Sequence, residues 1–353
     1  MKSGALAIKI LMTVLVLAGL VACRTIGYYS QAARGQLAIL WNREPINALL
    51  ANEELPTELR QKLSTILEIR QFATEELLLP AGGSYLAYVE LDRQHVVWNV
   101  FAAPEFSVEP VNWCYPVAGC VSYRGYFSED AALDFAGRLQ QQGYDVYTGG
   151  VDAYSTLGWF DDPVLSTVIT RQDYQLAALI FHELAHQLVY VSGDTTFNES
   201  FATAVEQEGL KRWLDMKGDA DSLERAYRES ERRQQFVELV IDFRERFAAL
   251  YRQRVAPSLM RERKEALQDE MRAAYRELNA SWGGIGAYDA WFARSLNNAQ
   301  LSTVSSYNEL VPAFEGLLQD QANDLQAFYG MIQEIAELSR EDREDRMQPR
   351  DNQ

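Results

Sequence analysis

The sequence predicts a mostly helical α+β fold with a small β-sheet and a long helical hairpin. Apolar residues recur at helical spacing over much of the chain, and the longest such stretches, 221–253 and 257–281, are rich in charge and predict an antiparallel hairpin. Short stretches of alternating polarity at 84–91, 95–102 and 145–151 predict strands. A chain of 353 residues with 48% hydrophobic content is long enough for one large domain with a helical extension.

The first residues predict a cleaved signal. Lys2 and Lys9 precede an apolar run over 10–22 that is shorter than the roughly 20 residues a membrane-spanning helix needs, so a permanent transmembrane helix is the weaker alternative. The residues Leu-Val-Ala-Cys ending at Cys23 resemble a bacterial lipoprotein cleavage box. That resemblance implies a signal peptide over 1–22 and a lipid anchor at Cys23. Because Arg24 follows the cysteine, it also implies a place on the outer membrane of the bacterial envelope, facing the periplasm.

Composition divides the rest of the chain into five parts. We expect a helical segment over 23–82, a catalytic core over 83–220 and the helical hairpin over 221–281. A helical part over 282–338 is expected to complete the core. The charged residues 339–353 are expected to form a frayed tail.

Turn and cap residues predict local boundaries within these parts. Pro45 and Pro56 interrupt the first helical segment. Ser128 opens a helix with acidic residues in its first turn, and Gly143 ends it. Residues 153–159 are expected to form either a core strand or an edge strand that binds a peptide by strand addition.

Two cysteines remain once Cys23 is assigned to the anchor. Cys114 and Cys120 are separated by five residues, and in an oxidising compartment we expect them to form a disulfide, with two free thiols as the alternative. Closing so short a loop stabilises by about 2 kcal/mol in the entropic model, so we expect the bond mainly to fix the turn containing Pro116. The spacing disfavours a metal site of the CxxC type.

The most specific motif is His-Glu-Leu-Ala-His at 182–186, within an apolar helix predicted over 175–190. His182 and His186 are one turn apart, so both imidazoles can bind a single zinc ion. Glu183 flanks that face and is placed to take a proton from a zinc-bound water, whose pKa falls to about 7, rather than to bind the metal. The chain has only three histidines, so this spacing rarely arises by chance.

A catalytic zinc needs a third protein ligand and one open position. We expect Glu199 to be that ligand, because the loop over 192–196 turns the chain back before a second helix predicted over 198–216. In the alternative interpretation Glu199 closes a capping box with Thr196. Glu206 is the reserve ligand, with a hydrogen bond to a histidine or plain solvent exposure as its other roles. The third histidine, His95, is expected to be an ordinary half-buried residue in a strand.

The chain after the signal resembles a known family. Asn-Glu-Ser-Phe-Ala at 198–202, following His-Glu-Leu-Ala-His, resembles the Asn-Glu signature of glutamate-ligated zincins of the thermolysin and membrane alanyl aminopeptidase type. The wider sequence is similar to a bacterial family of predicted zinc aminopeptidases, many of them lipoproteins, over 113–120, 123–127, 153–163, 296–299 and 311–314. This resemblance implies a zincin-like fold and peptide hydrolysis with one zinc ion. The interval from His186 to Glu199 is shorter than in thermolysin-like enzymes.

Charge limits the classes of partner. The formal net charge is -17, with 33 basic and 50 acidic residues, and no basic stripe is interleaved with aromatic residues. We therefore expect no binding to nucleic acid. The acidic surface fits cationic substrates, although solubility alone also accounts for it.

Together these patterns predict a zinc metallopeptidase, most simply an aminopeptidase acting on peptide substrates. Two other classes stay open: an endopeptidase or amidase of the envelope, and a non-catalytic zinc lipoprotein whose hairpin binds a protein partner that the sequence does not identify. Several further residues could contact the substrate or support the ligands, with helix capping and packing as their alternative roles; these are Glu206, Asn198, Tyr154, Asn298 and Tyr307.

Overall fold

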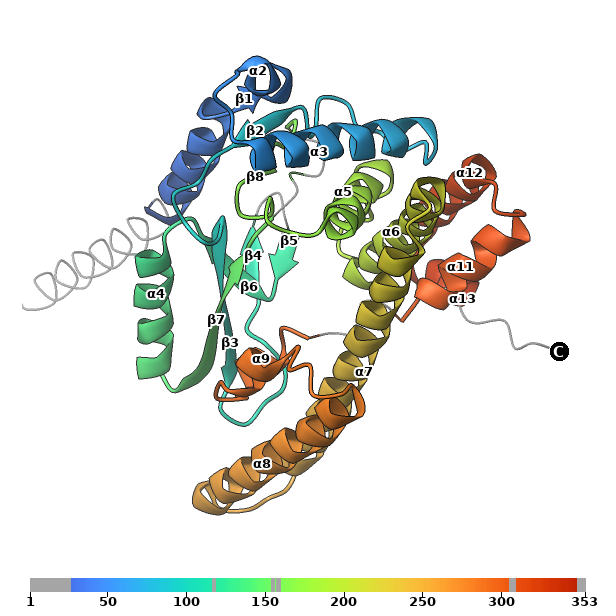
Figure 1. The fold of residues 1–353 in the computed structure, drawn as a ribbon. Coiled ribbons are helices and arrows are strands. Elements are labelled where there is room, and N and C mark those ends of the chain that lie inside the picture. The colour runs from blue at the N-terminus through green and yellow to red at the C-terminus, as the bar shows by residue number, and fades with distance from the viewer. Residues whose placement is uncertain (1–26, 116–118, 154–155, 157–159, 305–308, 348–353) are drawn as a thin grey trace, which may run out of the picture.

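The computed structural model describes residues 27–115, 119–153, 156, 160–304 and 309–347, and its architecture is the mostly helical α+β fold that the sequence predicts (Figure 1). Several sequence predictions lie outside these residues. They concern the signal and Cys23, the turn at Pro116, most of the strand expected over 153–159 with Tyr154, and Tyr307.

The first helical segment is interrupted at both prolines, as predicted. A helix covers 27–41. Strand β1 (Glu44–Pro45) ends at Pro45, which directly precedes α2 (Ile46–Ala51). Pro56 is the N-cap residue of α3 (Thr57–Glu75). Proline has no backbone N–H to donate within a helix, so it sits at these boundaries without loss of a helical hydrogen bond.

Two small three-stranded sheets lie beside the helices. The first has the order β1-β2-β8, with β2 (Ala87–Val89) antiparallel to β1 and parallel to β8 (Val164–Leu165). The second is antiparallel and has the order β6-β3-β7, built from β6 (Tyr123–Tyr126), β3 (Val97–Pro104) and β7 (Tyr144–Val151).

Helix α4 (Glu129–Gln141) packs on the second sheet. Alternate residues of β3, including Trp98 and Val100, are buried in one cluster with Ala132 and Leu139 of α4. Ser128 caps α4 by accepting a hydrogen bond from the N–H of Ala131, as predicted. The helix ends before Gly143, whose φ is +86°, a conformation that favours glycine.

The strand expected over 84–91 is shorter than predicted. The chain turns through Gly82 and Tyr85, whose φ angles of 47° and 61° are left-handed and incompatible with a strand. Pairing therefore begins only at Ala87.

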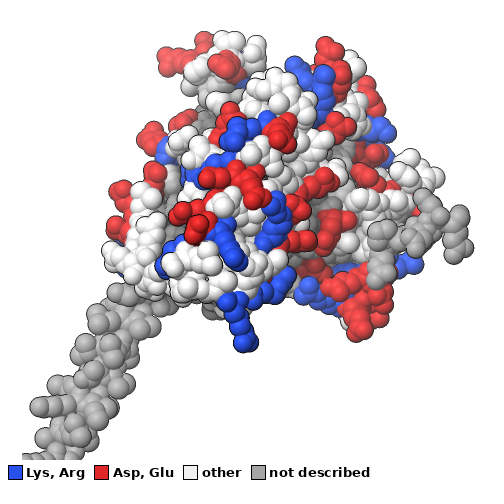
Figure 2. Space-filling model, turned by 90° about the horizontal axis from the view of Figure 1, so that it is seen from below, with Lys and Arg blue, Asp and Glu red and all other residues white. Residues whose placement is uncertain are grey.

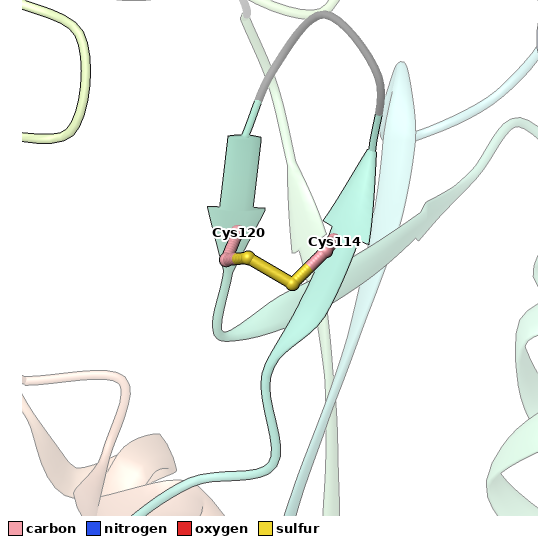
Figure 3. Close-up of a disulfide and its surroundings, with 2 residues drawn as sticks. All are labelled: Cys114 and Cys120. Carbon is pink, nitrogen blue, oxygen red and sulfur yellow. A yellow bond between two sulfur atoms is a disulfide. The ribbon is translucent and has the colours of Figure 1, made fainter.

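The predicted disulfide is present, and the alternative of two free thiols was wrong. Cys114 and Cys120 lie directly opposite each other in the hairpin of β4 (Trp113–Tyr115) and β5 (Gly119–Val121), and their Cα atoms are 3.9 Å apart (Figure 3). The bond joins the two strands across the turn.

The main hydrophobic core lies among five helices. Helices α5 (Asp173–Leu188) and α6 (Thr195–Lys217) lie side by side and pack against α3, α11 (Val311–Asp320) and α12 (Leu325–Ala336) (Figure 1). The fully buried rings of Phe181, Phe197, Phe201 and Phe314 fill its centre. This core holds α5 and α6 in a fixed relative position.

The predicted hairpin is confirmed. It consists of α7 (Ala220–Tyr251) and α8 (Pro257–Ser281). These two helices pack with α9 (Asp289–Phe292) and α10 (Asn298–Leu301) around a second hydrophobic core. The rings of Phe236 and Tyr288 stack there with centroids 3.9 Å apart. In Figure 1 the hairpin extends away from the body at its lower end, while the other end of α7 lies beside α6.

The expectation of a fully frayed carboxyl-terminal tail was wrong for its first part. Residues after Leu338 form α13 (Arg340–Arg346). Arg343 is only 5% exposed and its guanidinium donates to the carboxylate of Asp194 over 2.7 and 2.9 Å. A buried ion pair and the buried side chain of Met347 hold this segment against the core.

The surface is strongly charged. On the face shown in Figure 2, acidic and basic side chains are interspersed rather than gathered into a field of one sign. Within the described part of the chain, no helix combines the length and the apolar character needed to cross a membrane.

Candidate metal centre and its cleft

Helix α5 presents the two histidines towards α6. The helix starts in a capping box between Gln172 and Gln175. Its buried residues Phe181 and Leu184 anchor it in the core. The rings of His182 and His186, one turn apart, have centroids 4.9 Å apart and lie nearly perpendicular to each other.

The start of α6 places Glu199. Asp194 caps the helix by accepting a hydrogen bond from the N–H of Phe197 at 3.1 Å, so α6 begins at Thr195, three residues earlier than predicted. The capping-box interpretation of Glu199 was therefore wrong, because Asp194 already fills the capping role. The side chain of Asn198, which is 2% exposed, accepts from the N–H of Val191 and donates to its C=O, both at 2.8 Å, and so fixes the turn between the two helices.

Three potential ligand groups converge between the helices. The Nε2 of His182 lies 3.4 Å from Oε2 of Glu199, and the Nε2 of His186 lies 3.7 Å from Oε1 of the same carboxylate. One ligand atom from each residue lies within 4.8 Å of the others. Tetrahedral zinc, with ligand bonds of about 2.0 to 2.1 Å, needs ligand atoms roughly 3.3 Å apart. Two imidazoles and one carboxylate are ligands that zinc takes, and the three ligand atoms would have to move closer together to bind one ion.

Glu206 contacts the ring nitrogen of His182 that faces away from Glu199. Its carboxylate lies 3.0 Å from Nδ1 of His182, on the opposite side of the ring from Glu199. A hydrogen bond at Nδ1 holds the proton there and leaves the Nε2 lone pair available to a metal. Of the roles considered for Glu206, the hydrogen bond to a histidine is the one that the geometry shows.

Without a metal ion, burial and neighbouring charges shift the pKa values of His182 and His186 in opposite directions. Burial by itself lowers the pKa of His182, but hydrogen bonds to Glu199 and Glu206 outweigh it and raise that pKa to about 10. Burial, and then the charge of His182, lowers the pKa of His186 to about 4. Burial acts to raise the pKa of Glu199, but the hydrogen bond with His182 outweighs it and the net shift is downward. One proton on His182 thus holds the carboxylates together, and a metal ion would have to displace it.

Glu183 lies next to this cluster but outside it. Burial raises its pKa to about 7, and the negative charges of Glu199 and Asp162 act in the same direction against the opposing effect of His182. A carboxyl group with a pKa near neutrality can both accept and return a proton at physiological pH.

Sequence reasoning missed the loop that packs beside Glu183. The N–H of Tyr85 donates to the carbonyl of Asp162 at 2.7 Å, and the hydroxyl of Ser84 accepts from the Gln187 side chain at 3.3 Å. Asp162 is 6% exposed and contributes to the raised pKa of Glu183. The only sequence signal for this loop is that Asp162 belongs to the stretch 153–163, which resembles the zinc aminopeptidase family.

His182 of the cluster borders a cleft of about 800 Å³. Residues of α5, α6, α7 and α11 line it, and His182 and Glu183 are part of its wall. The contribution of α7 was not predicted, because nothing in its spacing distinguishes a cleft-facing hairpin from a solvated one. The ionisable residues of the cleft are mainly acidic; besides His182 and Glu183 they are Arg171, Glu206, Tyr174, Tyr227, Glu229, Arg233, Glu238, Glu309 and Glu315.

Other candidates from the sequence lie away from the cluster. His95 is not part of it, and its Nδ1 lies 2.6 Å from Asp152. Asn298 is fully buried in α10, where its side-chain amide donates to the carbonyls of Pro104 and Glu105 at 3.1 and 2.9 Å. Its role is therefore to join α10 to the end of β3. Tyr154 and Tyr307 lie outside the described residues.

Comparison with known proteins gives one informative match. A protein-family model covers residues 27–347, a span that includes both histidines, Glu183, Glu199 and Glu206. No curated protein and no solved structure matches the chain. Because the matched span is most of the chain, the protein belongs to the family described as "Putative aminopeptidase".

Proposed function

We propose that the protein is a zinc-dependent aminopeptidase in which His182, His186 and Glu199 bind one zinc ion. The observation that carries the proposal is the convergence of their three ligand atoms to within 4.8 Å, with His182 on the wall of a cleft of about 800 Å³. Three protein ligands leave one position of a tetrahedral ion open, as a catalytic site requires. Family membership supports the peptide as the substrate class.

Each residue then has a distinct task. When bound, zinc would supply a Lewis acid and lower the pKa of a water molecule to about 7. Glu183 takes the proton from the attacking water and delivers it to the leaving amine, and its own pKa of about 7 suits both transfers. Glu206 keeps the proton of His182 on Nδ1 and so orients the ring.

The charge of the cleft favours amino-terminal trimming. An aminopeptidase must hold the substrate's α-ammonium group, which a carboxylate does best. Glu229 is engaged by the hydroxyl of Tyr174 at 2.7 Å and the amide of Gln175 at 3.3 Å. Further along the same cleft, Glu238, Glu309 and Glu315 supply more carboxylates.

We also propose that the protein acts in the bacterial envelope, where a lipid at Cys23 would tether it.

The test uses the chain from residue 24 onward, which retains every residue that the structure describes. Zinc content is measured, followed by hydrolysis of a panel of free peptides and their amino-acetylated counterparts. The Glu183→Gln variant should keep zinc and lose hydrolysis. Glu208→Gln is the matched control, because Glu208 lies on α6 and pairs with Arg212 at 2.7 Å instead of facing the histidines.

The outcomes separate the three classes. One zinc per chain with Glu183-dependent release of amino-terminal residues from free peptides alone supports the proposal. Cleavage of acetylated peptides would instead identify an endopeptidase. Zinc binding without hydrolysis of any peptide in the panel would contradict an enzymatic role and favour a zinc-containing binding protein. Absence of stoichiometric zinc would refute the metal site itself.

A further inference from the structure

The helix over 27–41 is fixed to the body of the protein by its inner face. Its Gln31 side chain accepts a hydrogen bond from the N–H of Phe127 at 3.1 Å and donates to the carbonyl of Gly125 at 3.4 Å. A Cβ atom at Gly35 would lie 2.1 Å from the ring of Phe127, so glycine is needed for this close approach. The ring of Tyr28 lies 3.9 Å below the guanidinium of Arg124. These contacts determine which face of the helix points outward.

The outer face of this helix is apolar. Tyr29, Leu37 and Trp41 are 43%, 46% and 81% exposed, and Ala33 between them is exposed as well. Residues spaced by four lie next to one another on a helix, so the four side chains form a continuous stripe. Trp41 is the most exposed of the large hydrophobic side chains in the described part of the chain. We call this surface the outer stripe.

The sequence segment that carries the outer stripe has a charge opposite to that of the whole chain. The chain carries 50 acidic residues and a net charge of -17, yet no aspartate or glutamate precedes Glu44. Between Cys23 and Glu44 the only charged residues are Arg24, Arg34 and Arg43. In an acidic protein this segment is therefore locally basic.

We propose that the outer stripe is a membrane-contact surface that lies in the headgroup region of a bilayer containing anionic lipids. Tyrosine and tryptophan, here at the two ends of the stripe, favour the boundary between water and hydrocarbon because each has an apolar ring and a polar atom. Arginine side chains beside such a helix are attracted to anionic headgroups. This proposal goes beyond peptide hydrolysis and does not depend on it.

The position of the helix in the chain argues for a bilayer rather than a protein partner. Gly27, the first helical residue that the structure describes, follows Cys23 by four residues. Such a segment spans at most roughly 14 Å when fully extended. A lipid on Cys23 would hold the helix at the membrane surface, and one acyl anchor gains stable binding when a second contact is added. A second copy of the chain would bring the same basic segment against itself.

Vesicle binding by the unacylated chain from residue 24 tests the proposal. Flotation is measured with phosphatidylcholine vesicles and with vesicles in which part of that lipid is phosphatidylglycerol. The protein should bind the anionic vesicles more tightly. The partition coefficient should fall by about tenfold for Leu37→Ser and again for Trp41→Ser, the loss expected for one large apolar side chain each.

A matched control separates the stripe from general hydrophobicity. Leu133 and Met216, on α4 and α6, are 52% and 57% exposed. The double variant Leu133→Ser with Met216→Ser removes similar exposed apolar area and should float like the parent protein. Tryptophan emission that shifts to shorter wavelength on vesicle addition in the parent, but not in Trp41→Phe, would place that ring in the bilayer.

Three results would overturn the proposal. The first is that the protein binds neither type of vesicle. The second is that the stripe variants and the control variant lose binding equally. The third is a dimer in sedimentation velocity that only the stripe variants abolish. All of these positions are exposed, so the variants should fold, as their thermal unfolding will show. Peptide hydrolysis in solution should be the same in every variant, so a failure here is distinguishable from a failure of the proposed enzymatic function.

Discussion

Zinc binding between pH 8 and 9 should release one proton from His182, which the metal must displace, in addition to the proton lost when the zinc-bound water, with a pKa of about 7, ionises. That imidazole is held between Glu199 at 3.4 Å and Glu206 at 3.0 Å, which raises its pKa to about 10. Over this range Glu183, with a pKa of about 7, has already lost its proton. His186, with a pKa of about 4, is already neutral. Neither group therefore contributes to the proton count.

The size of the proton's effect on zinc affinity follows from the difference between the pKa of His182 and the pH of the solution. At pH 8 the pKa of His182 lies about 2 units higher, so competition by the proton weakens the apparent zinc affinity about 100-fold, or about 2.7 kcal/mol. Zinc binds the neutral imidazole, whose population grows as the pH rises. Loss of the His182 proton should thus by itself raise the apparent affinity about tenfold from pH 8 to pH 9, and this contribution should end above pH 10.

Two measurements check this prediction. Competition with a chromophoric chelator gives the affinity at each pH, and calorimetry in buffers of different ionisation enthalpy gives the number of protons released. Glu206→Gln should lower the pKa of His182 and reduce the proton release at pH 8 to 9, while Glu208→Gln should leave it unchanged. Release of no more than the one proton that zinc-bound water supplies, with no effect of Glu206→Gln, would refute the reasoning about His182.

Three further outcomes are expected. Glu183→Gln should lower the rate of peptide hydrolysis by about 10² to 10⁴, the usual contribution of a general base, with zinc content unchanged. Arg343→Met should lower the free energy of unfolding, measured in urea, by about 3 kcal/mol, because it leaves the buried carboxylate of Asp194 without its partner. Replacing Cys114 and Cys120 together by serine should cost only about 2 kcal/mol in the same assay, since the loop they close is short.

Each of these has its own control. For the ion pair it is Arg340→Ala, because the bond between Arg340 and Glu344 is exposed and should change stability by less than about 1 kcal/mol. An Arg343 variant as stable as the Arg340 variant would contradict a structural role for α13. Loss of zinc in Glu183→Gln would place Glu183 among the ligands. For the disulfide, an unfolding midpoint unaffected by reducing agent would show that the bond adds no stability.

The sequence by itself determined the features that depend on residues close together in the chain. Two histidines at positions 182 and 186 share a helix face whatever the rest of the fold does, so the closeness of their rings was predictable. The hairpin was predictable because two long amphipathic stretches are joined by a few residues. The disulfide was predictable because Cys114 and Cys120 are the two cysteines left after Cys23 and were expected in an oxidising compartment.

Only the tertiary structure decided which groups surround that motif. Asp194 caps α6 through a local contact, but its ion pair is with Arg343, 149 residues away, so the order of the tail could not be read locally. The cleft needs α7 to lie across α5 and α6, and the pKa of Glu183 depends on burial and on Asp162. The periodicity of apolar residues identifies the buried face of a single helix. Burial and electrostatic shifts arise where several elements meet, and that meeting is set by the packing of the whole chain.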